Sequence, residues 1–221
     1  MSYAIIIMGP PGSGKGTQAA LLAERFDVQH IESSKIILKN FAERPTDSDV
    51  IEAKAAYDSG ELVPPPILFA WLQKEVRQLL PLGKHMVFDG SPRSVYEQER
   101  LYPLLCDVFG KQNIKGYYLE LSDEIATYRM QYRRLCSVCN RTVPYTEQNK
   151  DLTTCPYEQC GGVLIKKSLD TPEVIAERLR VFIRRTKPVA DFLIQEGVMK
   201  VLNGDENIEL IHKIIVSKLG F

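Results

Sequence analysis

Short apolar runs alternate with amphipathic stretches along the chain, and this alternation predicts the order of its elements. Residues 3–8 form an isoleucine-rich run bounded by glycine and proline, which is typical of a strand buried on both faces of a parallel sheet. Other apolar runs predict strands at 28–31, 84–88, 114–121 and 199–202. Helical spacing of apolar residues predicts helices at 18–26, 35–42, 48–57, 67–80, 94–109, 123–134, 171–196 and 206–219.

The order of these elements predicts the fold class. Because strands alternate with helices, we expect an α/β fold with a five-stranded parallel sheet and helices on both faces. Residues 33–62 are expected to form a helical excursion outside the sheet, in which Ser33 or Ser34 caps the helix at 35–42. The chain therefore predicts one compact domain with insertions.

Composition and charge narrow the class of protein. Of the 221 residues, 44% are hydrophobic and 25% are charged, as is usual for a globular domain. Lysine plus arginine and aspartate plus glutamate both number 28, so bulk attraction to nucleic acid or to an acidic membrane is not expected. The apolar runs are too short to span a bilayer, and the chain enters its first strand without a leader, so we expect a cytoplasmic protein.

Residues 9–17 follow the first predicted strand and read G-P-P-G-S-G-K-G-T. Glycines let backbone N–H groups turn inward around phosphate oxygens, and the start of the next helix adds partial positive charge. Lys15 can then reach the terminal phosphates as a point charge. The general pattern has Ser or Thr directly after the lysine, whereas here Gly16 precedes Thr17. A plain structural turn is the alternative, but lysine, spacing and flanking elements together favour a nucleotide phosphate site.

A second polar motif, D-G-S-P-R at 89–93, follows the strand predicted at 84–88. Ligands of open α/β sheets bind at the carboxyl ends of the strands, so Lys15 and Asp89 are expected to face the same crevice. Asp89 is a candidate to hold the water shell of Mg²⁺ there, and a simple turn-forming role is the alternative.

Four of the five cysteines fall in one short segment, as Cys136-x2-Cys139, 15 intervening residues, and Cys155-x4-Cys160. This spacing fits a tetrahedral four-thiolate zinc site. Residues 133–168 carry few apolar side chains, so a structural metal would replace the missing core. Disulfides or unpaired thiols are the alternatives, and a catalytic zinc is not expected because four thiolates leave no open position.

Arginines on both sides of this cysteine segment are candidates for phosphate recognition, since the guanidinium group binds phosphate in a bidentate manner. The two flanks can converge if the segment folds back over the crevice. Arg184 and Arg185 are instead interpreted as solvated surface residues. The candidate arginines are Arg93, Arg129, Arg133, Arg134 and Arg178.

Taken together, G-P-P-G-S-G-K-G-T-Q at 9–18, D-G-S-P-R at 89–93 and the four-cysteine segment resemble an adenylate kinase with a zinc-containing lid. The order Gly16-Thr17 is itself that family's pattern, and the resemblance covers essentially the whole chain. It implies reversible transfer of the terminal phosphoryl group from Mg-ATP to AMP. It also implies a core (1–32, 63–132 and 169–221), a nucleoside-monophosphate (NMP)-binding subdomain (33–62) and a zinc lid (133–168).

The resemblance implies ATP, Mg²⁺ and structural Zn²⁺ as ligands, small-molecule nucleotides as the partners, and a monomer that binds neither nucleic acid nor membrane. The resemblance also implies the following roles for individual residues of this chain. The catalytic residues are Lys15, Asp89, Arg93, Arg133 and Arg178. ATP is bound by Gly12, Ser13, Gly14, Lys15, Gly16, Thr17, Arg129 and Gly204. AMP is bound by Ser33, Glu61, Val63, Gly90, Arg93, Lys167 and Arg178.

Five positions depart from the family's pattern, and most of them are on the acceptor side. Leu38 and Lys167 stand in place of arginines, and Leu169 in place of an aspartate. Ser91 replaces an aromatic residue, and Glu97 replaces the glutamine that reads the adenine. These changes keep UMP or CMP open as alternative acceptors. A nucleotide-dependent binding module with a zinc knuckle is the alternative from another class.

Overall fold

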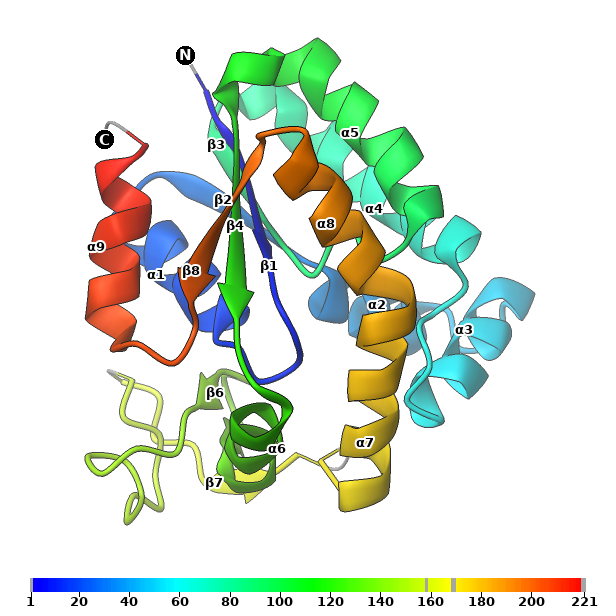
Figure 1. Cartoon of the computed structure of the whole chain (residues 1–221). Coiled ribbons are helices and arrows are strands. Elements are labelled where there is room, and N and C mark those ends of the chain that lie inside the picture. The colour runs from blue at the N-terminus through cyan, green and yellow to red at the C-terminus, as the bar shows by residue number, and fades with distance from the viewer. Residues whose placement is uncertain (1, 158, 168–169, 220–221) are drawn as a thin grey trace.

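The computed structural model describes residues 2–157, 159–167 and 170–219, which are built around a five-stranded parallel sheet in the order β2-β3-β1-β4-β8 (Figure 1). The sequence predicted all five strands, and the structure confirms the α/β fold. Ile7 of β1 and Glu32 of β2 both pair with Asp89 of β3, so these three strands end level with one another. The strands are β1 (Ala4–Met8), β2 (Val28–Glu32), β3 (His85–Asp89), β4 (Ile114–Glu120) and β8 (Met199–Asn203).

Helices cover both faces of the sheet because the side chains of β1 alternate between two hydrophobic cores. Ile5 and Ile7 pack in the core beneath α1 and α9, whereas Ile6 and Met8 pack in the larger core beneath α4, α5 and α8 (Figure 1). These helices and the others are α1 (Lys15–Arg25), α2 (Ser33–Glu43), α3 (Ser48–Asp58), α4 (Pro65–Leu79), α5 (Val95–Phe109), α6 (Asp123–Tyr132), α7 (Pro172–Val181), α8 (Lys187–Gln195) and α9 (Ile208–Ser217), with 3-10 turns at Leu80–Leu82 and Lys111–Asn113.

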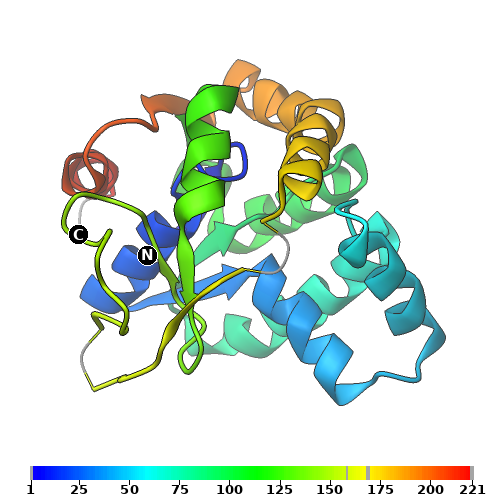
Figure 2. The same ribbon diagram turned by 90° about the horizontal axis from the view of Figure 1, so that it is seen from below.

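Figure 2 looks onto the carboxyl ends of the strands, with α2 and α3 on one side and the cysteine segment on the other. The expected serine cap of α2 is wrong. Glu32 is at the N-cap, and Ser33 is the first helical residue. The Ser33 side chain is fully buried, and its hydroxyl donates a hydrogen bond to Gly90 O at 2.8 Å. The buried hydroxyl is therefore satisfied by the Asp89–Arg93 loop rather than by its own helix.

Helix α6 ends at Tyr132, two residues earlier than predicted. Arg133 is extended, with φ −61° and ψ 154°, and Arg134 begins β5 (Arg134–Cys136). Strand β5 pairs antiparallel with β6 (Thr142–Val143) and β7 (Leu164–Lys166) in a second, three-stranded sheet. The sequence did not predict this sheet, because strands of two or three residues carry almost no periodicity.

The helix predicted at 171–196 is interrupted by a π-helical turn at Phe182–Thr186, between α7 and α8. Lys187 N donates to Phe182 O across this wider turn, and Pro188 follows without an N–H to donate. Thr186, at the end of the turn, donates through Oγ1 to Arg93 O at 2.9 Å. The π-helical turn is therefore hydrogen-bonded to the Asp89–Arg93 loop.

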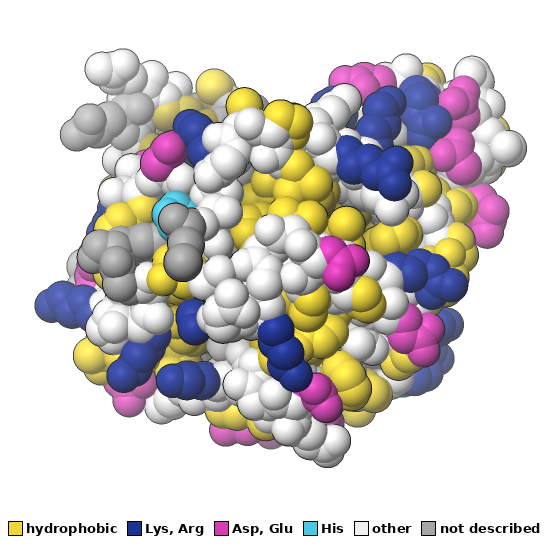
Figure 3. Space-filling model, turned by 90° about the horizontal axis from the view of Figure 1, so that it is seen from above, with side chains coloured by type: hydrophobic (Ala, Val, Ile, Leu, Met, Phe, Trp, Pro, Cys, Tyr) yellow, Lys and Arg dark blue, Asp and Glu magenta, His cyan; other side chains and the backbone are white. Residues whose placement is uncertain are grey.

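The surface carries both signs of charge. Figure 3 views the end of the molecule opposite to Figure 2, and its basic and acidic side chains are interspersed among hydrophobic and uncharged ones. No helix within the described ranges is both long enough and apolar enough to cross a membrane.

Candidate active site

A cavity of about 210 Å³ lies at the carboxyl ends of β1, β2 and β3. It brings together side chains that are distant in the sequence, from the phosphate-loop motif, the D-G-S-P-R motif and both flanks of the cysteine segment. The charged residues predicted for the site that line it are Lys15, Glu61, Asp89, Arg93, Arg133, Lys167 and Arg178.

The glycine loop has the backbone that a phosphate cradle requires. Gly12 and Gly14 have φ of 85° and 90°, and a Cβ on Gly12 would lie 2.8 Å from Ala126 O. Gly14 is the N-cap of α1, so the first turn of the helix points its free N–H groups at the loop. Ser13 is buried beneath the loop, and its hydroxyl has no partner among the described residues.

Lys15 is the first residue of α1, and its Nζ is 3.3 Å from Pro10 O. Burial and the charges of Arg93, Arg178 and Arg133 lower the pKa of Lys15 to about 7, whereas Asp89 opposes the shift. The crevice thus holds more positive than negative charge around this amine. An anion bound there would relieve this imbalance and return the amine to its protonated state.

Asp89 is 7% exposed and lies beside His30, with His30 Nε2 3.5 Å from Asp89 Oδ2. Burial raises the pKa of Asp89, but the adjacent His30 side chain and the positive charges of Lys15 and Arg93 outweigh it and lower the pKa overall. Asp89 is therefore ionised at neutral pH. No sequence pattern predicted a role for His30, because its contact with Asp89 depends on the pairing of β2 with β3.

Asp170 joins two of the predicted arginines. Arg133 donates to it from Nε at 2.6 Å and from Nη2 at 2.7 Å, and Arg178 donates from Nη1 at 3.0 Å. Burial and the nearby charge of Arg133 lower the pKa of Arg178 to about 10, although Asp170 opposes the shift. One carboxylate thus holds two guanidinium groups at the crevice.

Lys167 brings a further cation from the cysteine segment. Burial and the charges of Arg133 and Arg178 lower its pKa to about 8, opposed by Asp170 and Glu32. Lys167 lines the same crevice as Arg133 and Arg178. Leu169, the other departure in this segment, lies outside the described residues.

The Asp89–Arg93 loop is fixed from within. Gly90 has φ 78°, and Arg93 Nε donates to its carbonyl oxygen at 2.6 Å. Ser33 donates to the same carbonyl oxygen. Ser33 therefore supports the loop from beneath and does not face the crevice, whereas Gly90 and Arg93 line it.

The two departures Ser91 and Glu97 bind each other beneath this loop. Ser91 Oγ donates to Glu97 Oε2 at 3.0 Å, and Arg93 N donates to the same oxygen at 3.2 Å. Ser94 Oγ lies 3.2 Å from Glu97 Oε1. Burial raises the pKa of Glu97, which is 1% exposed. The serine in place of an aromatic residue thus supplies a hydrogen bond to the carboxyl group.

On the other wall, Glu61 lines the crevice and also pairs with Arg184 at 2.7 Å. Arg184 is therefore ion-paired rather than simply solvated. The Val63 side chain belongs to the larger hydrophobic core, and its neighbour Leu62 lines the crevice. Leu62 belongs to the segment 61–63 that the resemblance placed beside the acceptor nucleoside, whereas sequence reasoning missed Tyr57, which also lines this wall.

At the opposite end of the site, the structure brings together two residues predicted to bind ATP. Arg129 Nη1 donates to Gly204 O at 2.8 Å, and Arg129 Nη2 pairs with Asp205 Oδ1 at 2.8 Å. The guanidinium plane is thus held between α6 and the loop after β8.

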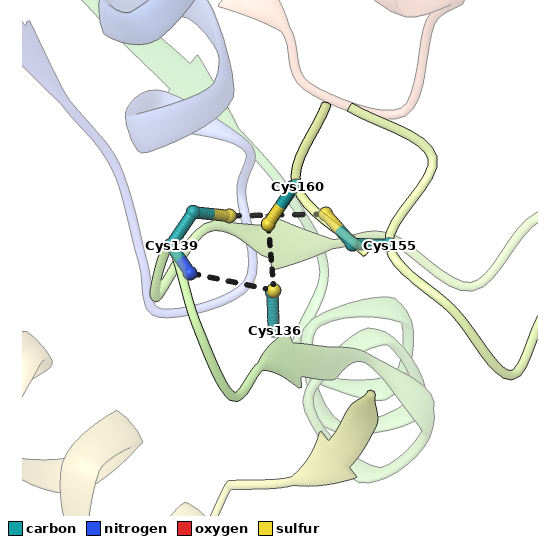
Figure 4. Close-up of side chains that lie close together, drawn as sticks. All are labelled: Cys136, Cys139, Cys155 and Cys160. Atoms are coloured by element: carbon teal, nitrogen blue, oxygen red, sulfur yellow. Dashed lines mark hydrogen bonds between the residues drawn. The ribbon is translucent and has the colours of Figure 1, made fainter. Parts of the chain in front are cut away.

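The four cysteine side chains of the segment point toward one another (Figure 4). Cys136 and Cys160 Sγ are 3.4 Å apart, Cys139 and Cys155 Sγ are 3.7 Å apart, and all four sulfurs lie within 4.8 Å of one another. A tetrahedron of Zn–S bonds of about 2.3 Å places its sulfurs roughly 3.8 Å apart, so the cluster fits zinc. Backbone N–H groups of Val138 and Cys139 also donate to Cys136 Sγ at 3.4 Å, which favours a thiolate.

Comparison with known proteins places this site in a family. The family model "Adenylate kinase" matches residues 7–198. Curated adenylate kinases are 34% identical in Methanothrix thermoacetophila, over 94% of both chains, and 30% identical in Clostridium tetani, over 98% of both. One from Staphylococcus aureus is 31% identical over 97% of this chain and 98% of its own. The chain therefore belongs to the adenylate kinase family.

Proposed function

We propose that the described crevice carries out reversible transfer of the terminal phosphoryl group from Mg-ATP to AMP, giving two ADP. Membership of the family makes the protein a nucleotide-binding phosphotransferase. The observation that carries the proposal is the convergence of Lys15, Arg93, Arg133 and Arg178 on one crevice, where burial and the three arginine charges lower the pKa of Lys15 to about 7. Transferring phosphoryl groups carry charge on their equatorial oxygens, and a fixed cluster of cations stabilises that charge.

On the donor side, the glycine loop would bind the ATP phosphates through its backbone N–H groups. Lys15 would lie against the terminal phosphates, and Arg129 would stack on the base beside Gly204. The loop residues in this role are Gly12, Ser13, Gly14, Gly16 and Thr17.

On the acceptor side, Arg93 and Arg178 would hold the phosphate of AMP, with Lys167 nearby. Arg133 would contact the transferring group once nucleotide competes with Asp170 for its guanidinium. Gly90, Glu61 and the backbone of Val63 would border the nucleoside, and Ser33 would support this border through Gly90.

Asp89 fits a role beside Mg²⁺, because it is buried, ionised and directed at the start of α1. When bound with ATP, Mg²⁺ supplies charge neutralisation at the phosphates. Asp89 would orient the water molecules of that ion. His30 would keep the carboxylate in place and ionised.

We assign the cysteine segment, residues 133–168, as a lid stabilised by structural Zn²⁺, residues 33–62 as an NMP-binding subdomain, and the remainder as the core. Lid closure would exclude water, which otherwise competes with the acceptor. Equal numbers of acidic and basic residues support small nucleotides, not nucleic acid or a membrane, as the partners. We further propose a cytoplasmic monomer.

An acceptor panel tests this proposal. The purified protein, with Mg-ATP, is given AMP, UMP, CMP or GMP, and formation of diphosphates is followed. AMP is expected to support turnover well above the other three. Preference for UMP or CMP would refute AMP as the acceptor, and no turnover with any of the four would refute the kinase function.

A further inference from the structure

Tyr57 stands on the acceptor wall of the crevice with its ring held in one place. It shares the inward face of α3 with Val50 and Ala53, at helical spacing. Its ring meets Phe41 of α2 edge-on, with centroids 5.5 Å apart and an interplanar angle of 83°. Two helices thus position the ring at the wall of the crevice.

Tyr57 stands close enough to the proposed phosphate-binding arginines for their charges to act on its phenol. Tyr57 lines the crevice with Arg93 and Arg178. Burial raises the pKa of this phenol, and the charges of Arg178, Arg93 and Arg133 counteract the rise without reversing it. The group is therefore neutral at physiological pH and can donate one hydrogen bond into a site rich in positive charge.

Helix α2 offers little for the acceptor phosphate in this chain. Leu38, at the place where the resemblance implies an arginine, is 50% exposed. The nearby lysines are engaged elsewhere, since Lys35 pairs with Glu32 at 3.0 Å and Lys39 pairs with Glu75 at 3.8 Å. The acceptor phosphate thus lacks the donor that α2 would otherwise supply.

We propose that Tyr57 binds the acceptor nucleotide, with its hydroxyl donating a hydrogen bond to the acceptor phosphate beside Arg93 and Arg178. The inference rests on the proposed function. It explains how a chain with Leu38 in α2 still holds the acceptor phosphate on that side. The contribution comes from α3, one helix further along the chain.

Tyr57→Phe tests the hydroxyl alone, because the ring and its packing on Phe41 are kept. The matched control is Tyr96→Phe, a tyrosine of α5 on which Arg100 stacks at 3.6 Å. We expect Tyr57→Phe to raise KM for AMP about tenfold, which is typical of losing a hydrogen bond to a charged group. The KM for ATP and the kcat should change by less than about twofold, and Tyr96→Phe should resemble the unmodified protein.

Competition experiments then identify the atom that is bound. AMP and adenosine are compared as ligands of the unmodified protein and of Tyr57→Phe. A phosphate contact predicts weaker AMP binding with unchanged adenosine binding. Equal weakening of both ligands would overturn the phosphate assignment, and an unchanged KM for AMP would overturn the role of Tyr57. If the unmodified protein shows no turnover, the proposed function fails instead, so the two failures are distinguishable.

Discussion

Gly16 and Asp89 approach each other so closely that a Cβ on Gly16 would lie 3.0 Å from Asp89 Oδ2. The second residue of α1 is therefore the place where the helix start meets the carboxylate at the end of β3. This contact gives a physical reason for glycine after Lys15, where phosphate loops in general have Ser or Thr. It fixes the distance between the phosphate loop and the residue proposed to act beside Mg²⁺.

Gly16→Ala is expected to lower kcat about tenfold, because Asp89 must move by a few tenths of an ångström and catalytic geometry is sensitive to small displacements. Steady-state kinetics with Mg-ATP and AMP measure the effect. Ala20→Ser, a small change on the half-buried side of the same helix, serves as the control. A Gly16→Ala protein with full activity would show that the close approach to Asp89 has no catalytic role.

Cys139→Ser is expected to abolish zinc binding and to lower the Tm by at least about 5 °C, because the metal replaces a hydrophobic core in this segment. Metal analysis of the unmodified protein should find about one zinc ion per chain. Cys106→Ser is the matched control, since Cys106 lies in α5, away from the cluster. Equal zinc content and equal Tm in both variants would argue against a structural zinc site.

The shifted pKa of Lys15 predicts a pH-dependent stability in the absence of nucleotide. The folded pKa is about 7 and the ordinary value is 10.5, so between these values the unfolded chain binds more protons. Stability should therefore rise as the pH increases from about 7 toward 10, because the buried amine then loses its proton. Below pH 7 the folded protein bears the full free-energy cost of burying a charged Lys15. Denaturant unfolding at pH 6 and pH 9 measures this effect, with Lys15→Met as the reference. An identical pH dependence in both proteins would contradict the lowered pKa.

His212 predicts a second pH effect, remote from the crevice. It is 3% exposed beneath α1, and neither ring nitrogen has a hydrogen-bond partner among the described residues. Burial lowers its pKa, the charge of Arg25 adds to the shift, and Glu209 opposes it. Because the unfolded histidine takes up a proton more readily, stability should fall as the pH drops below about 6.5.

His212→Leu should remove this part of the acid sensitivity. Between pH 7 and pH 5, the unmodified protein is expected to lose more unfolding free energy than the variant. Urea unfolding at both pH values gives the difference. An equal loss in the two proteins would show that His212 is not the residue responsible.

The sequence predicted the parts of the site that depend on local pattern. The apolar run of β1, the glycine loop and Lys15 are adjacent in the chain, and Asp89 ends an apolar strand, so parallel pairing alone brings them to one edge. The cysteine spacing predicted the sulfur cluster for the same reason.

Contacts that depend on tertiary packing were not predictable. His30 comes close to Asp89 only through the register of β2 against β3, and Tyr57 lines the crevice with the arginines only through the placement of α3. Ser91 and Glu97 looked like two separate departures, but the structure joins them in one buried hydrogen bond. The prediction of a serine cap for α2 was wrong because the Ser33 hydroxyl donates its hydrogen bond to Gly90 O, 57 residues away in the sequence.

The central claim is phosphoryl transfer between two nucleotides in the crevice around Lys15. The most direct test is the yield of ADP from Mg-ATP and AMP, measured for the unmodified protein and for Lys15→Met. The account predicts two ADP formed for each ATP consumed, and a loss of nearly all turnover in Lys15→Met. ATP consumption without phosphorylation of AMP, or a Lys15→Met protein that retains full turnover, would contradict it.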